Sequence, residues 1–425
     1  MSLIERPRVV RQHPAAPAQT FYVAVESVEP GGGNFTLRRS FPGPYDEDAL
    51  AAAGRGLLAR HPALRTGLRR TRAGLPAGDW RRYYLDYRQV VADEVALPLV
   101  VAATLGDRPD TEPFRLAVAP LFRMRAAPTA QGGFVVGITT HHAIGDGWSQ
   151  QVLWRDLERL YVEALGRPVE PLPSAGRSFG DFVEEDFRTR STGGWDRSIA
   201  FWCRQLAGVR LRRLPAPGAD GGSPGAGSLH HELTPSERAA LQALAAAGGA
   251  SPFAAVLGLY ALALRDVVGG DEMVVSTPFA NRRRPETWDV VGVFANVVLL
   301  RLRFEGAPTP AEVVRQAWGL TLRTLAHGHV SMDAIAQHAP AQDWAAVEDG
   351  ARIGIRQFGG EVPAPEGKPE RPGAGKDYGF QTDLLLDCGF GASTTWLRLT
   401  WRPHQVDSGV AEDVFARLRA LLGGP

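Results

Sequence analysis

Cysteine and lysine are scarce in this chain. Its 425 residues include only two cysteines, Cys203 and Cys388, which lie too far apart for the short spacings that hold a metal ion. We therefore expect two free thiols and no metal centre. So few thiols in a chain of this length are typical of a reducing cytoplasm. Lysine occurs only at Lys368 and Lys376, and the bias toward arginine is explained by a GC-rich genome rather than by function.

Long apolar runs and an excess of one charge are also missing. No run approaches the roughly 20 apolar residues that cross a bilayer, and residues 1–13 lack the apolar core of a secretory signal. The formal net charge is only +1, which gives no reason to expect nucleic acid or an anionic membrane as a partner. The sequence thus predicts a cytoplasmic protein whose partners are other proteins and small molecules.

The length and two Gly/Pro-rich stretches divide the chain. A chain of 425 residues is too long for one ordinary domain, and two lobes of roughly 200 residues each fit better. Residues 214–228 and 361–376 have almost nothing to bury, so we expect loops or linkers there. Because the lobe boundary should lie somewhat before the first stretch, we predict an N-terminal lobe at 1–175 and a C-terminal lobe at 176–425.

Helix and strand patterns interleave in both halves. Residues 46–60 and 150–165 have the apolar spacing of amphipathic helices, and residues 134–139 form a short β-rich run. In the second half, Ser251 before Pro252 is a typical helix start. The remaining predicted elements are a helix at 253–264, strands at 272–276, 294–304 and 396–401, and a closing helix at 410–422. The chain is therefore predicted to be mixed α/β.

The most informative segment is residues 141–149, which read His-His-Ala-Ile-Gly-Asp-Gly-Trp-Ser. It follows a predicted strand and precedes a predicted helix, so its side chains have a rigid support and can face a cleft. Because neighbouring strand residues point to opposite sides, one of His141 and His142 should face that cleft while the other packs inward. An imidazole, with an ordinary pKa of about 6.5, can take a proton from an attacking amine or alcohol at neutral pH.

The rest of the segment adds groups that an acyl-transfer site uses. Asp146 can orient the imidazole, or it can bind an arginine and hold the loop shut. Gly147 lets the backbone approach a ligand closely, and N–H groups at the start of the next helix can stabilise an oxyanion. An isolated histidine pair usually has no function, but the full His-His-x-x-x-Asp-Gly pattern arises by chance in roughly one chain in a thousand. We therefore interpret the segment as an active site.

This pattern resembles the active-site motif of nonribosomal peptide synthetase condensation domains, whose wider family includes chloramphenicol acetyltransferase and plant acyltransferases. Other segments match the same family in its order, over nearly the whole chain. Ala18-Gln19 with residues 29–34 resembles a degraded opening motif, whose usual Arg-Met-Trp portion is missing. The further matching segments are RHPALRT at 60–66, PF at 113–114, PLFR at 120–123, FGDF at 179–182, FWCRQL at 201–206, STPFANR at 276–282 and GVFAN at 292–296.

The resemblance implies a fold and a role for each motif residue. The implied fold is α/β (α+β), with two chloramphenicol-acetyltransferase-like lobes in a V-shaped pseudo-dimer and a tunnel between them. His142, the second histidine, is implied to be the base, and His141 is implied to be a packing residue. Asp146 is implied to be structural and paired with Arg282, whereas Gly147 lines the reaction centre through its backbone.

Four other positions carry expectations of their own. Arg65 should hold the fold through ion pairs or hydrogen bonds. Trp148 and Ser149 commonly follow the motif in condensation domains that use an L-configured or non-epimerised donor, and we assign them to substrate binding. Asn296 either touches the substrate or is a structural amide.

The implied function is condensation in natural-product biosynthesis. An acyl or aminoacyl thioester on the phosphopantetheine of an acyl or peptidyl carrier protein is transferred to an amine or hydroxyl, on a small molecule or a carrier-bound acceptor. The chain itself is expected to bind no cofactor or metal. The initial Met1 favours a free-standing enzyme, and a monomer suffices because the lobes pair internally.

Three alternatives remain open. One is an acyltransferase of the same fold that uses acyl-coenzyme A, although the matches in the second half favour condensation. An epimerisation enzyme should carry acidic and histidine signatures downstream of the motif, and we do not find them. A condensation-like module that only recruits other proteins is the third, and the intact His142, Asp146 and Gly147 argue against it.

Overall fold

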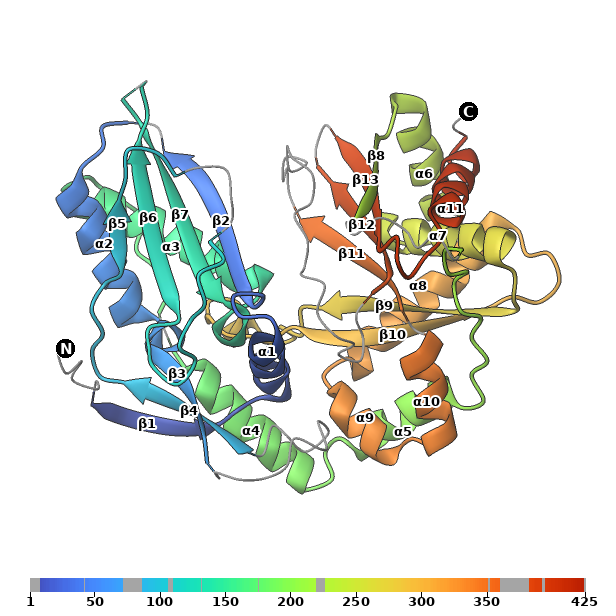
Figure 1. Ribbon diagram of the computed structural model, residues 1–425, viewed down its shortest axis with the longest axis horizontal. Coiled ribbons are helices and arrows are strands. Elements are labelled where there is room, and N and C mark those ends of the chain that lie inside the picture. The colour runs from blue at the N-terminus through green and yellow to red at the C-terminus, as the bar shows by residue number, and fades with distance from the viewer. Residues whose placement is uncertain are drawn as a thin grey trace. The chain divides into compact units, whose positions relative to one another are not determined.

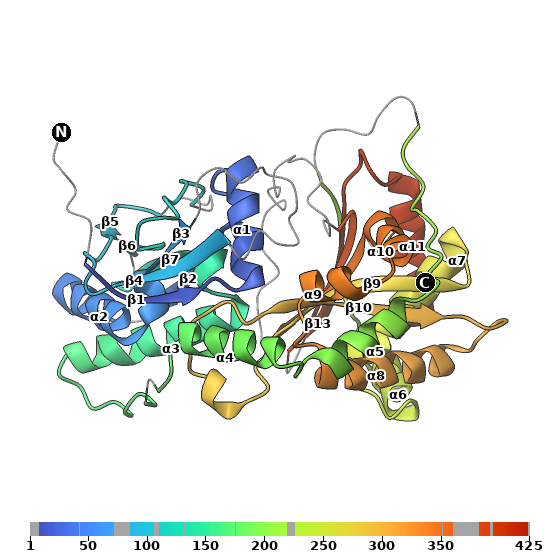
Figure 2. The same ribbon diagram turned by 90° about the horizontal axis from the view of Figure 1, so that it is seen from below.

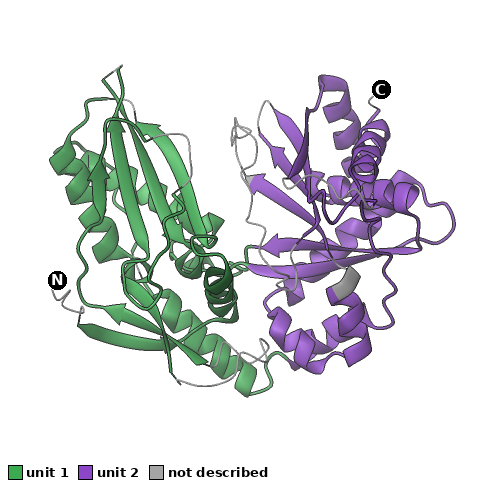
Figure 3. Ribbon diagram, in the orientation of Figure 1, with its two compact units in different colours: residues 1–195, 280–295 green, residues 196–279, 296–425 purple. Residues whose placement is uncertain are grey.

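The computed structural model divides into two compact units (Figure 3). Unit 1 contains Met1–Trp195 and Ala280–Ala295, and unit 2 contains Asp196–Phe279 and Asn296–Pro425. The structure describes residues 8–41, 43–71, 86–105, 110–130, 132–174, 176–218, 226–350, 352–359, 382–391 and 394–423. Of the predicted loop at 214–228, residues 214–218 and 226–228 are described, and its last two residues instead begin strand β8 (Gly227–Glu232). The predicted loop at 361–376 lies outside the described residues.

The division between the units differs from the predicted boundary between residues 175 and 176. Helix α4 (Phe179–Ser191) belongs to unit 1, because its apolar face packs against Ala16 in a buried cluster. The Ala280–Ala295 segment, from the second half of the sequence, also belongs to unit 1 and contributes Val290 and Val293 to that cluster. A single boundary in the sequence cannot describe these units, because unit 1 contains two segments that are brought together only by tertiary packing.

In unit 1, a sheet with strand order β2-β7-β6-β5 supports the histidine segment (Figure 1). Strand β7 (Phe134–His141) pairs antiparallel with both β2 (Asn34–Phe41) and β6 (Phe122–Pro128). Helices α2 (Glu47–Arg60) and α3 (Gly147–Ala164) pack their apolar faces on this sheet, in one buried cluster with the inward side chains of β7. The strand that carries the histidines is therefore fixed on both edges and on one face.

The predicted elements of the first half are present, with one shifted boundary. Asp46 caps α2 through the N–H of Ala49 at 2.8 Å, and β7 covers the predicted strand and continues to His141. Helix α3 begins at Gly147, ahead of the predicted start at residue 150, because Asp146 caps it by accepting the N–H of Ser149.

The other elements of unit 1 include a second sheet with the order β1-β4-β3. They are β1 (Val9–Pro14), α1 (Pro17–Val28), the short helix η1 (Pro62–Arg65), β3 (Thr66–Arg70), β4 (Tyr87–Ala92), β5 (Leu99–Val101), and the short helices η3 (His142–Ile144) and η4 (Pro285–Thr287).

Unit 2 is built on a sheet with the order β10-β9-β11-β12-β13-β8, with helices against it (Figure 2). Helix α7 (Pro252–Val268) is almost wholly apolar and is buried along most of its length, in a core that also contains Cys388. The remaining elements are α5 (Asp196–Leu206), β8 (Gly227–Glu232), α6 (Pro235–Ala247), β9 (Glu272–Phe279), β10 (Asn296–Arg303), α8 (Pro310–His327), α9 (Met332–His338), α10 (Ala341–Gly350), β11 (Ile353–Gly359), β12 (Leu384–Phe390), β13 (Thr395–Trp401) and α11 (Ser408–Leu421).

The elements predicted for the second half are also present. Ser251 caps α7, whereas β10 starts at Asn296 and not at residue 294. Phe294 and Ala295 are excluded from the strand because their backbone N–H groups bind Asp146 in unit 1. Within the described ranges, no single helix is long and apolar enough to cross a bilayer, and α6 with α7 passes that test only as a pair bent by 98°.

Candidate active site

His141 is the inward-facing member of the histidine pair. It ends β7, and its side chain is fully buried. Its Nδ1 accepts the backbone N–H of Ala143 at 3.1 Å, which assigns the ring proton to Nε2, and Nε2 lies 3.4 Å from Oε2 of Glu26. A Cβ on Gly33 would lie 2.2 Å from this Nε2, so the β2 side of the ring requires glycine. The packing role implied for His141 matches this placement.

Glu26 on α1 is a site residue that the sequence analysis missed. One carboxylate oxygen accepts the backbone N–H of Gly31 at 3.0 Å, while the other faces His141. Burial by itself raises the pKa of Glu26, but the His141 imidazole and the backbone N–H groups of Gly31 and Gly33 outweigh it, and the net pKa is lowered. Glu26 is therefore a carboxylate at neutral pH that orients His141.

The turn that carries His142 is clamped through its backbone. His142 begins the short helix η3, and its N–H donates to the carbonyl of Gly33 at 2.7 Å. The next residue, Ala143, donates its N–H to His141, and its carbonyl accepts Nε2 of the buried Gln19 at 2.9 Å. Gln19 is part of the degraded opening motif, so this part of the motif holds the turn of His142 in place.

The His142 imidazole is partly exposed and stacks against aromatic rings. Its centroid lies 4.7 Å from that of Tyr22, with 7° between the planes, and 5.0 Å from that of Phe35, with 23° between the planes. Stacking restricts rotation of the imidazole, so a base at this position is oriented before a substrate arrives.

Asp146 ties helix α3 to the Ala280–Ala295 segment. Its Oδ1 accepts the N–H and the hydroxyl of Ser149, each at 2.8 Å, and Nη2 of Arg282 at 3.0 Å. Its Oδ2 accepts the backbone N–H groups of Phe294 at 3.0 Å and Ala295 at 3.1 Å. The predicted pairing with Arg282 is confirmed, and of the two possibilities left open for Asp146 the structure shows the arginine-bound one.

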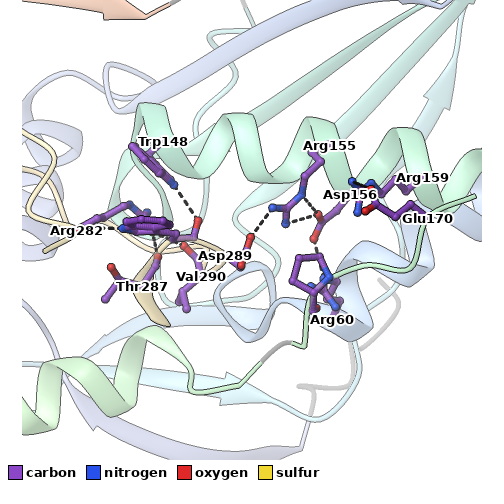
Figure 4. Close-up of polar contacts among 12 residues, drawn as sticks. Arg60, Trp148, Arg155, Asp156, Arg159, Glu170, Arg282, Thr287, Asp289 and Val290 are labelled. Atoms are coloured by element: carbon purple, nitrogen blue, oxygen red, sulfur yellow. Dashed lines mark hydrogen bonds and ion pairs between the residues drawn. The ribbon is translucent and has the colours of Figure 1, made fainter. Parts of the chain in front are cut away.

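Arg282 closes the Ala280–Ala295 segment upon itself (Figure 4). Its Nη1 donates to the carbonyls of Thr287 and, at 2.7 Å, Val290, while its Nη2 also donates to the carbonyl of Gly292 at 3.2 Å. The side chains of Arg282 and Asp146 are only 1% and 5% exposed. Burial lowers the pKa of Arg282, and Asp146 opposes this effect. The pair is a buried ion pair in which both carboxylate oxygens and both terminal guanidinium nitrogens are hydrogen-bonded, whereas Nε of Arg282 has no partner among the described residues.

The motif residues after Asp146 diverge in their surroundings. Gly147 is the exposed first residue of α3, and a Cβ there would contact nothing within 4 Å. Trp148 is 43% exposed, and its Nε1 donates to the carbonyl of Trp288 at 2.8 Å. Ser149 is fully buried, and its hydroxyl bonds within the Asp146–Arg282 cluster and to Gly292. This placement favours a structural role for Ser149 over the substrate contact predicted from the sequence.

Arg65 and Asn296 lie outside this cluster and bind backbone carbonyls. Arg65 donates to the carbonyls of Leu58, Ala92 and Asp93, which ties α2 to the end of β4. Asn296 belongs to unit 2, where its Nδ2 donates to the carbonyls of Gly328 at 2.9 Å and Val330 at 2.6 Å. Of the two roles left open for Asn296, these bonds favour the structural amide.

A second buried network links α3 to the same segment. Asp156 is fully buried and accepts hydrogen bonds from Arg60 at 2.7 Å and Arg155 at 2.8 Å, and its Oδ2 lies 2.9 Å from Nε2 of His61. Arg155 also binds Asp289 (Figure 4). Burial lowers the pKa of His61 despite the nearby Asp156 carboxylate, so His61 resists protonation in the folded protein.

We expect stability to fall as the pH drops below 6.5, the ordinary pKa of histidine. There the unfolded chain binds a proton on His61 that the folded chain does not bind, because the folded pKa is lower. Urea unfolding at about pH 7.5 and about pH 5.5 measures this loss, which should be smaller in His61→Gln. The exposed His404→Gln is the matched control and should keep the wild-type dependence. Equal pH dependence in His61→Gln and wild type would contradict the assignment.

Comparison with known proteins identifies the family. The family model described as the condensation domain matches residues 11–347, and the chain belongs to this family. The chain is 30% identical over 300 residues to nonribosomal peptide synthetase kk1B of Curvularia clavata, covering 66% of this chain and 2% of that protein. It is 27% identical over 338 residues to phosphinothricin tripeptide synthetase PhsC of Streptomyces viridochromogenes, covering 74% of this chain and 30% of that protein. The chain thus spans only a small part of these relatives.

Solved structures share the fold of the whole chain. SgcC5 of Streptomyces globisporus has a TM-score of 0.74 at 21% identity and covers 96% of this chain and 97% of its own. The X-domain from teicoplanin biosynthesis has a TM-score of 0.75 at 22% identity, covering 99% and 96%. The epimerization domain of tyrocidine synthetase B has a TM-score of 0.75 at 17% identity, covering 98% of each chain. These structures establish the fold of condensation domains but do not select one activity among its members.

Proposed function

We propose that this chain joins a carrier-bound acyl thioester to an amine or hydroxyl, forming an amide or an ester, with His142 as the base. The observation that carries the proposal is the state of His142: partly exposed, stacked on Tyr22 and Phe35, and held on a turn whose backbone is bound on several sides. Nδ1 of His142 is buried, so Nε2 is the nitrogen that meets the substrate.

The proposed reaction is a direct transfer. The acceptor nitrogen or oxygen attacks the thioester carbonyl carbon while His142 Nε2 takes the proton from the attacking atom. The carbon–sulfur bond then breaks, and the phosphopantetheine sulfur leaves and receives that proton as a thiol. General-base assistance contributes about 10²–10⁴-fold, and holding both reactants together contributes at least as much. The reaction needs no acyl-enzyme intermediate.

The other motif residues act on the geometry of this step. Backbone N–H groups at the start of α3, beginning at Gly147, lie at a helix N-terminus, where a developing oxyanion is stabilised. Asp146 holds that helix start against Arg282 and the Ala280–Ala295 segment. The proposal gives Asp146 a positioning role and no share in the proton transfer.

Family membership supports a carrier protein as the donor, with its phosphopantetheine supplied by the partner and not by this chain. We propose a hydroxyl as well as an amine as the acceptor, because the SgcC5 structure is a complex with a naphthyl ethanediol, which is an alcohol. The rival role is recruitment, since the teicoplanin X-domain has been solved in complex with OxyB.

The choice of donor tests this proposal. The same acyl group is offered on a holo-carrier protein and on coenzyme A, with a mixture of small amines and alcohols as acceptors. We expect kcat/KM to be at least about tenfold higher for the carrier-bound donor than for the coenzyme A donor. A tenfold difference corresponds to about 1.4 kcal/mol of transition-state stabilisation supplied by contacts with the carrier protein. Equal use of both donors identifies an acyl-coenzyme A acyltransferase. Tight carrier binding without product, for every acceptor offered, favours the recruiting module.

A further inference from the structure

Unit 2 contains a cavity of about 120 Å³ that is separate from the histidine segment in sequence and in unit. The residues that line it come from the start of helix α7, the last turns of helix α8, the end of strand β9, and strands β10 and β11. Its lining residues all belong to unit 2, and they are Phe253, Thr277, Pro278, Phe279, Val298, Leu300, Thr321, Thr324, Leu325 and Gln357. Leu325 is 50% exposed, so solvent reaches the mouth of the cavity at this side chain.

The size and lining of the cavity select a small apolar group. A cavity of about 150 Å³ lined by apolar side chains holds one benzene molecule, and the present 120 Å³ has room for a group of that size or slightly smaller. Phe253, Phe279, Val298 and Leu300 supply apolar walls from opposite layers. An aryl ring or a compact branched alkyl group is the chemical class that gains most from these walls.

One threonine of the cavity differs from the other two. Thr277 is only 7% exposed, and its hydroxyl has no hydrogen-bond partner among the described residues. The other two threonines of the lining are satisfied locally, since Thr321 donates to the carbonyl of Ala317 at 2.9 Å and Thr324 to that of Leu320 at 3.0 Å. The hydroxyl oxygen is not one of the fully buried polar atoms that lack a partner, so it opens into the cavity, where a ligand atom can make the hydrogen bond that solvent otherwise makes.

We propose that this cavity binds a small apolar group with one hydrogen-bonding atom, such as a phenol ring, which pairs with Thr277. Resting on the proposed condensation, the group is a side chain of the acyl donor or of the acceptor. On this proposal the cavity selects substrates by the size of that group and by its hydrogen-bonding atom.

The hydroxyl of Thr277 is tested with phenol and benzene as probes on the full chain. Methyl NMR spectra report binding through Val298, Leu300 and Leu325, the methyl-bearing apolar residues of the lining. Thr277→Val keeps the shape and removes the hydroxyl, so we expect phenol to bind about three- to tenfold more weakly while benzene binds equally well or better. Thr321→Val is the matched control, because that hydroxyl is already bonded within α8, and it should leave the phenol affinity unchanged.

The cavity itself is tested by closing its mouth. Leu325→Trp should abolish the methyl shifts that both probes cause, whereas Leu322→Trp, on the same helix and 46% exposed, lies outside the lining and should preserve them. Melting curves of the variants exclude misfolding as the cause. If neither probe shifts these methyl signals in the wild type, or if Thr277→Val leaves phenol binding unchanged, the proposal is overturned.

These binding measurements do not depend on turnover. The cavity proposal can therefore be overturned while the proposed condensation is upheld, and the condensation can be overturned while the cavity is still found to bind its probes. Once condensation is observed, Leu325→Trp identifies the source of the bound group. A raised KM for the acyl carrier assigns the cavity to the donor, and a raised KM for the acceptor assigns it to the acceptor. Unchanged KM values for both substrates would contradict a role of the cavity in substrate choice.

Discussion

Replacing His142 with alanine should lower the rate of condensation by about 10²–10⁴-fold, which is the usual contribution of a general base. The loss should appear in kcat more than in KM, because the imidazole acts on the proton in transit and not on the binding of either substrate. Alcohol acceptors should lose more than amines, since a hydroxyl needs a base to become nucleophilic. Residual activity is expected, because both reactants are still held together.

The measurement is a single-turnover rate with acyl carrier and saturating acceptor. The exposed His230→Ala is the matched histidine control and should stay close to the wild-type rate. Melting curves of His142→Ala should remain close to wild type, because the clamp on the turn uses the backbone of residues 142 and 143. A His142→Ala rate within a few-fold of wild type would remove the base from the mechanism.

Asp146→Ala should destabilise unit 1 by about 3–5 kcal/mol, because it leaves the charge of Arg282 buried without its partner. The change also removes the cap of α3 and the acceptor for the N–H groups of Phe294 and Ala295. Activity should fall as a consequence, since the helix start beside His142 loses its anchor. Thermal and urea unfolding measure the stability effect.

A double-mutant cycle with Arg282 separates the ion pair from the cap. Asp146→Ala with Arg282→Met should lose less stability than the sum of the single variants, because neither buried charge is then left alone. Ser149→Ala is the milder control in the same cluster, with an expected loss of about 1 kcal/mol for its hydrogen bonds. An unchanged melting temperature in Asp146→Ala would contradict the structural role of the pair.

The sequence predicts the local features of the site well. The sequence predicted that the two histidines face different surroundings, and His141 is buried while His142 is partly exposed, although His142 begins η3 and does not continue the strand. The capping ability of Asp46 and Ser251 followed from residue type and position. The Asp146–Arg282 pair joins residues 136 positions apart, so no local pattern contains it, and the family resemblance supplied it.

The tertiary features could not be read from one sequence. Gln19, Glu26, Tyr22 and Phe35 meet around the histidines only because α1 and β2 pack beside the end of β7. Nothing in the local pattern marks Glu26 as buried, since an acid on a helix is usually exposed. The membership of the Ala280–Ala295 segment in unit 1 was missed for the same reason, because it depends on hydrogen-bond donors and acceptors that are distant in sequence.

The central claim is direct transfer from a carrier thioester to an acceptor at His142. The measurement that tests it most directly is the intact mass of both proteins and of the small-molecule product during turnover, with an isotopically labelled acceptor. We expect each acyl group lost from the carrier to appear in one amide or ester with the labelled acceptor, and we expect this chain never to gain the acyl mass. A transient acyl adduct on the chain, or unloading of the carrier to free acid without labelled product, would contradict it.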